Sequence, residues 1–161
     1  MGDPAWRMGY ALLAHYGLSF DLQTPYWHLH EAAELARAFS DTQIILNHTG
    51  LPADRSDAGL AAWRQAMRQL AREANVAVKI SGLGQPGQPW TLEATRPIVL
   101  DTIAIFGVER CMFASNFPVD KLIADFDTIF SGFKAIVRGF PRADAEKLFH
   151  DNAVRFYRLD G

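Results

Sequence analysis

The sequence contains a single cysteine, Cys111, among 161 residues. One cysteine excludes an internal disulfide and any zinc site built on several cysteines. The net charge is only −2, so the chain lacks the basic surface typical of nucleic-acid-binding proteins, and no nucleic-acid partner is expected. It also lacks an apolar run near the roughly 20 residues that a membrane span needs, and an apolar signal segment at its start. We therefore expect a cytoplasmic protein without membrane contact.

The overall composition is that of a folded domain. The sequence is 49% hydrophobic and 21% charged, which is typical of a globular protein and argues against long disorder. Its length is enough to bury a substantial core. We expect one domain over residues 1–161.

Apolar runs and helical patterns alternate along this domain. Strands are predicted over residues 18–23, 44–48, 76–81 and 110–116. Helices are predicted over residues 4–16, 27–39, 57–74, 91–106, 122–132 with an extension to 137, 142–149 and 152–157. This order predicts an α/β fold with a parallel sheet. No Gly-x-Gly-x-x-Gly follows the first strand, so a dinucleotide site has no support.

Four such units are too few to close a (β/α)₈ TIM barrel, which needs at least about 200 residues. The fold expected is therefore about half of such a barrel, with about four βα units followed by helices. In parallel α/β folds, ligands bind where the carboxyl ends of the strands meet. His48 and Ser81 end two predicted strands, and Asn116 and Asp120 follow a third.

Several segments together resemble one known family. With Asp21, His48, Lys79–Gly82, Phe113–Pro118 and Asn152–Tyr157 in this order, the chain resembles the amidohydrolase superfamily. The branch it is most similar to is the amidohydrolase-2 group of metal-dependent TIM-barrel hydrolases, which includes sugar-lactone and pyrone-dicarboxylate lactonases. The resemblance covers nearly the whole chain, but only the C-terminal part of the family's barrel. It implies a hydrolase that uses activated water on a lactone or related cyclic ester or amide of a small organic or sugar acid.

The resemblance also implies roles for the residues at the strand ends. Family members carry an H-x-H pair on the first strand, a histidine on a middle strand and an aspartate at the end of the last strand. His48 matches the middle histidine, as a metal ligand or a group that polarises the carbonyl. The implied cofactor is one divalent metal, Zn or Mn, although some members of this branch work without metal. Asn116 stands in the aspartate's place, and an amide cannot act as a general base. Asp120 either supplies the missing carboxylate or caps the helix that follows.

Other polar residues are candidates for binding the small-molecule substrate. Asp21 and Gln23 alternate on the first predicted strand and Lys79 lies on the third, so all three can face the barrel lumen; Ser81 ends the third strand. His28 and His30 begin a predicted helix rather than ending a strand, so we do not interpret them as the family's H-x-H pair. Of the two, His28 is the better candidate for contact with substrate. In the alternative interpretation these residues do not bind substrate: Lys79 extends its charged end to solvent along apolar surface, and His28 and His30 lie on the surface.

A second hypothesis is a truncated half-barrel that is vestigial or only binds a small molecule. It is motivated by the missing H-x-H pair and by the amide at position 116. Half a barrel leaves two sheet edges and apolar helix surface exposed, which favours association. If the chain is stable alone, we expect a homodimer that completes a pseudo-barrel.

Overall fold

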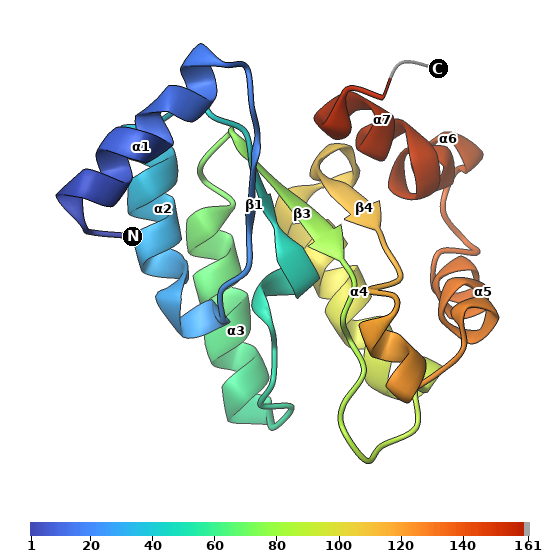
Figure 1. Ribbon diagram of the computed structural model, residues 1–161. Helices are drawn as coiled ribbons and strands as arrows, with labels where there is room; N and C mark the ends of the chain where they lie inside the picture. Colours follow the sequence, from blue (N-terminus) through green and yellow to red (C-terminus); the bar gives the residue numbers. More distant parts are fainter. Residues whose placement is uncertain (160–161) are drawn as a thin grey trace.

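The computed structural model describes residues 1–159 and shows a parallel sheet with helices on both sides (Figure 1). Its strands are β1 (Phe20–Leu22), β2 (Ile44–Leu46), β3 (Val76–Ile80) and β4 (Cys111–Phe113). They lie in the order β1-β2-β3-β4, each parallel to the next. A doubly wound sheet reverses its strand order at a switch point, whereas a barrel keeps sequence order. The topology therefore matches the expected portion of a TIM barrel.

The helices surround this sheet. They are α1 (Pro4–His15), α2 (Leu29–Ala38), α3 (Asp57–Leu70), α4 (Leu92–Phe106), α5 (Phe126–Ile136), α6 (Arg142–Glu146) and α7 (Asn152–Tyr157). In four of them, α1, α3, α4 and α5, a backbone N–H of the first turn donates to a polar capping side chain. The capping residues are Asp3, Ser56, Thr91 and Asp125. Helix α4 continues through Pro97 without a restart. Within residues 1–159, no helix combines the length and apolar character needed to cross a membrane.

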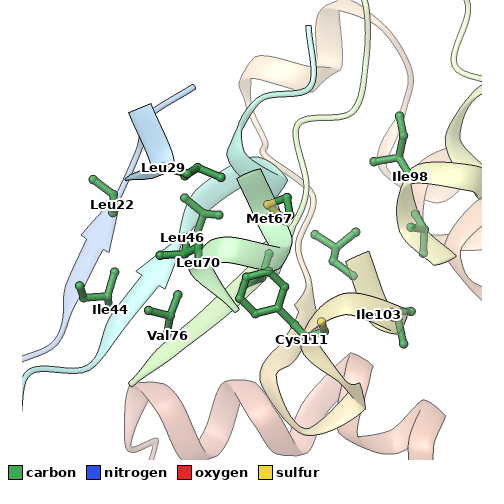
Figure 2. Packing of buried hydrophobic residues seen from close by; sticks show 14 of the residues in the cluster. Leu22, Leu29, Ile44, Leu46, Met67, Leu70, Val76, Ile98, Ile103 and Cys111 are labelled. Carbon is green, nitrogen blue, oxygen red and sulfur yellow. The ribbon is translucent and has the colours of Figure 1, made fainter. Parts of the chain in front are cut away.

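The main core lies between the sheet and helices α1 to α5. Alternate strand residues point to this side because side chains in a strand alternate between the two faces. They meet buried residues from the helices, and Figure 2 shows Leu22, Ile44, Leu46, Val76 and Cys111 among Leu29, Met67, Leu70, Ile98 and Ile103. Cys111 is fully buried here, as expected for a core residue.

The opposite face of the sheet, which would face a barrel lumen, is covered by the C-terminal helix. Ile45, Ala77 and Met112 are buried against Ala153, Phe156 and Tyr157 of α7. Helix α7 is anchored by Asn152, whose side-chain Nδ2 donates to the carbonyl oxygens of Val108 and Cys111, both at 2.7 Å. The two faces of the short sheet are therefore both buried, as expected for parallel strands.

Two predicted helix boundaries in the C-terminal part of the chain were wrong. Residues Val119–Leu122 form a short 3₁₀ turn, and α5 begins at Phe126 instead of Leu122 because the Asp125 carboxylate accepts from the backbone N–H of Thr128 at 2.6 Å. Asp120 is therefore not the cap of this helix. The break expected after Phe149 is also missing, since a π-helical turn over Lys147–Asp151 joins α6 to α7.

The strands are shorter than predicted, and α3 ends at Leu70 rather than at residue 74. Short 3₁₀ turns occupy Asn47–Gly50 and Val108–Arg110, where strands were expected to continue or begin, and Tyr26–His28, where a helix was expected to begin. The turn after β2 is the one that shapes the candidate site.

Candidate functional site

The chain turns sharply after β2, at the carboxyl edge of the sheet. His48, Thr49, Gly50 and Leu51 all have positive φ values, between 50° and 68°. Three of these are not glycine, and non-glycine residues pay about 1–2 kcal/mol each for this conformation. The indole Nε1 of the fully buried Trp63 donates to the Thr49 carbonyl oxygen at 2.8 Å and holds the turn from α3. The strained turn thus fixes the direction in which the His48 side chain leaves the backbone.

His48 is held by the end of the neighbouring strand. Its Nδ1 lies 2.8 Å from Oγ of Ser81, which is 1% exposed. The next residue, Gly82, has φ +61°, and a Cβ there would lie 2.7 Å from the same Nδ1. Burial lowers the pKa of His48 and Lys79 lowers it further, while Asp120 acts in the opposite direction. The imidazole is therefore mainly neutral at pH 7, with one nitrogen committed to Ser81.

Asp120 and Asn116 form a second pair beyond the end of β4. Asn116 has φ +57°, and its side-chain Nδ2 donates to Oδ1 of Asp120 at 2.8 Å. Asp120 is 6% exposed. Burial raises the pKa of its carboxyl, while the Asn116 hydrogen bond and the nearby His48 lower it. Both groups lie after parallel strands that flank β3, at the carboxyl edge of the sheet, and each influences the pKa of the other.

Lys79 and Asp21 lie on the inner face of the sheet, close to this space. The Lys79 Nζ is 3.3 Å from Oδ1 of Asp21, and the Tyr157 hydroxyl donates to the same oxygen at 2.8 Å. Gln23 is exposed and follows Asp21 across the buried Leu22, so it shares Asp21's side of the strand.

His28 stands apart from this group. Its Nδ1 lies 2.8 Å from Oε1 of Glu31 on the exposed start of α2. Within residues 1–159, no hydrogen bond or ion pair joins His28 to the other candidate residues. The structure thus brings His48, Ser81, Asn116 and Asp120 together, with Lys79 and Asp21 beside them, and leaves His28 outside.

Comparison with known proteins identifies the family. Residues 1–159 match the sequence profile of the Amidohydrolase family. The chain belongs to this family. Among curated proteins, this amidohydrolase chain is 54% identical over 156 residues to the uncharacterized protein y4mH of Sinorhizobium fredii, covering 97% of the chain and 52% of y4mH. It is 32% identical over 155 residues to an L-fucono-1,5-lactonase of Burkholderia ambifaria, covering 93% of this chain and 53% of that lactonase.

A solved structure shows the same likeness in three dimensions. An amidohydrolase from Burkholderia multivorans, crystallised with bound zinc, matches with a TM-score of 0.92 and 26% sequence identity. The match covers 98% of this chain and 58% of that one. The amidohydrolase chain thus spans about half the length of the relatives it matches.

The side chains present do not by themselves fit a complete metal centre. Within residues 1–159, no three histidine, cysteine, aspartate or glutamate side chains gather closely enough to hold an ion. His48 and Asp120 are two candidate ligands, whereas catalytic zinc sites use three protein ligands and keep one position open. A metal centre in this amidohydrolase would need ligands from outside the described residues, and we derive no step through a metal.

Two residues near the site were not identified from the sequence. Arg55, in the loop before α3, donates from Nη2 to the carbonyl oxygen of Leu83 at 3.1 Å, and its Nε is buried. Tyr157 reaches Asp21 from the far end of the chain. Arg55 belongs to no recognised motif, and although Tyr157 lies in the segment 152–157 that carries the resemblance, its contact with Asp21 joins segments that only the folded chain brings together.

Proposed function

We propose that this chain carries the C-terminal half of the active site of a hydrolase that opens a lactone, or a related cyclic ester or amide, of a small organic or sugar acid. The observation that carries the proposal is that the carboxyl edge of the sheet holds both a histidine bonded to the buried Ser81 and a buried carboxylate bonded to Asn116. Family membership supports hydrolysis, and the lactonases among the relatives support the substrate class.

His48 is proposed to polarise the carbonyl that is attacked. When the Ser81 hydroxyl donates to Nδ1, the ring proton lies on Nε2, which can then donate to the carbonyl oxygen. In the other tautomer, Nδ1 donates to Ser81 and Nε2 presents a lone pair, which suits a metal ligand. The direction of the hydrogen bond with Ser81 therefore distinguishes the two roles expected for His48.

Asp120 is proposed to be the general base that takes a proton from the attacking water. A carboxyl whose pKa is raised by burial accepts a proton more readily than an ordinary aspartate. Asn116 cannot accept that proton, but its N–H fixes one carboxylate oxygen and leaves the other for water. Asp21, Gln23 and Lys79 are proposed to bind the hydroxyl or charged groups of the substrate, whereas His28 is not included because it pairs with Glu31 apart from this group.

The test is lactone hydrolysis by the protein purified at its native length, whose intact mass is measured at the same time. Asp120→Asn keeps the shape of the side chain and removes the base, so we expect kcat to fall by roughly 10²- to 10⁴-fold. Asp127→Asn, at an exposed position of α5, is the matched control and should stay within about twofold of the parent. L-Fucono-1,5-lactone is the first substrate to try, with and without Zn²⁺ or Mn²⁺. Equal rates for Asp120→Asn and the parent would contradict the proposed base.

The second candidate function is a half-barrel that binds a small molecule without turning it over. It is favoured by the incomplete set of metal ligands among residues 1–159. If the native mass equals that of these 161 residues, we propose a homodimer in which the partner covers the free edges of β1 and β4. A monodisperse monomer in size-exclusion chromatography with light scattering would contradict the dimer.

A further inference from the structure

Arg55 lies at a cavity whose chemistry the hydrolytic mechanism does not use. The cavity has a volume of about 370 Å³ and lies between the loop that follows β3 and the first turn of α4. Its walls include Leu83, Gln85, Gln88, Trp90 and Thr95. A space of this size is typical of a small-molecule site, and its walls are polar and apolar in about equal measure.

The guanidinium of Arg55 is poorly satisfied by the rest of the chain. Of its five N–H donors, one on Nη2 bonds to the Leu83 carbonyl oxygen, while the buried Nε has no partner among residues 1–159. No carboxylate in that range forms an ion pair with Arg55. The adjacent Asp54 is engaged elsewhere, because its Oδ1 accepts from the Ser56 backbone N–H at 2.9 Å. A partly buried cation without a counter-charge is costly, so an anion from outside the chain would be bound favourably.

The walls of the cavity limit the charge of that anion. Arg55 is the only charged residue among those that line it. Gln85, Gln88, Thr91 and Thr95 add neutral groups that can donate hydrogen bonds. One guanidinium with neutral donors matches a single negative charge, as on a carboxylate, better than the roughly two charges of a phosphate.

Arg55 also connects this cavity with the proposed catalytic group. It lines a second hollow of about 160 Å³, whose wall includes Gly82 and Pro52. Gly82 is in contact with the His48 ring, as the position of its absent Cβ shows. Arg55 therefore borders both the cavity and the hollow that reaches Gly82 beside the His48 ring.

We propose that the Arg55 cavity binds the carboxylate of a small hydroxy acid. The inference rests on the proposed function only for the choice of acid, since hydrolysis of a lactone releases a hydroxy acid. Arg55 takes the carboxylate with its free N–H groups, and the two glutamine amides and the threonine hydroxyls bond to the hydroxyl groups.

The probe is gluconate, titrated into the full chain by calorimetry at constant ionic strength, with sorbitol as its uncharged counterpart and inorganic phosphate as a second anion. We expect gluconate to bind and sorbitol to bind far more weakly. Arg55→Gln should weaken gluconate binding by roughly 10- to 100-fold, because a charge-assisted hydrogen bond is lost. Arg68→Gln, on an exposed part of α3 outside the cavity, is the matched control and should bind as the parent does.

Two further variants distinguish failure of this inference from failure of the proposed function. Ala94→Leu fills the cavity and leaves the arginine in place, so it should also weaken binding, and circular dichroism of each variant checks the fold. His48→Gln should lose lactone hydrolysis but keep gluconate binding. Binding that depends on His48 and not on Arg55 would overturn the inference and leave the proposed function standing. Arg55-dependent binding of phosphate without binding of gluconate would also overturn it.

Discussion

Replacing Gly82 by alanine tests whether the end of β3 shapes the position of His48. Gly82 has φ +61°, a conformation that costs an L-residue about 1–2 kcal/mol. The added Cβ would also lie 2.7 Å from Nδ1 and 2.8 Å from Cγ of His48, too close for either atom to stay in place. Overpacking of this kind costs about 1–3 kcal/mol. The free energy of unfolding should therefore fall by about 2–5 kcal/mol.

The chain offers a matched control for the backbone part of this cost. Gly87 lies in the same loop with φ +73°, and a Cβ there meets nothing within 4 Å. In Gly87→Ala the free energy of unfolding should fall only by the cost of the left-handed conformation, about 1–2 kcal/mol. Urea unfolding followed by circular dichroism gives both values, and the nuclear magnetic resonance signals of the His48 ring should shift in Gly82→Ala alone. Equal stability losses in the two variants, with unchanged His48 signals, would refute the contact between Gly82 and the ring.

Two further predictions concern buried groups. Trp63→Phe leaves the Thr49 carbonyl oxygen without its indole donor, so the free energy of unfolding should fall by about 1–3 kcal/mol. A loss below about 0.5 kcal/mol in urea unfolding would contradict a role for this hydrogen bond in stabilising the turn. Burial raises the pKa of Cys111 to about 12 from an ordinary value of 9.0, so the native thiol at pH 8 should react with a disulfide reagent roughly a thousand times more slowly than the unfolded chain. Fast stoichiometric reaction of the folded protein would show that β4 is more open than described.

Local sequence patterns carried much of the information about the fold. The apolar run of residues 111–114 correctly predicted β4, and the polar residues directly after it correctly located the edge of the sheet. The start of α5 was misplaced because Asp120 and Asp125 are equally plausible caps in the sequence, and only the 3₁₀ turn over Val119–Leu122, which contains Asp120, decides in favour of Asp125. The pairing of Asn116 with Asp120 spans only four residues, so the idea that Asp120 serves the site could be formed from the sequence.

Contacts between distant segments could not be predicted in this way. Arg55 meets the carbonyl oxygen of Leu83, 28 residues away, and an arginine in a polar loop gives no sign that one of its nitrogens will be buried. The same holds for His48 and Ser81, which are 33 residues apart. Each was identified as a strand-end residue, but their hydrogen bond depends on the strained turn after β2, which no propensity indicates.

The packing of α7 on the inner face of the sheet determines when this fold can be completed during synthesis. Asp21 and Tyr157 are separated by 136 residues, and the apolar inner side chains of β2, β3 and β4 are covered by residues 153–157. While the ribosome is still making the preceding segments, these side chains have no such cover. The nascent sheet therefore exposes apolar side chains and is prone to aggregation. The contact between Asp21 and Tyr157 that accompanies their burial spans 136 residues, and contacts of such long range form slowly. A chaperone that binds extended apolar segments would act on this chain before α7 emerges, and much less afterwards.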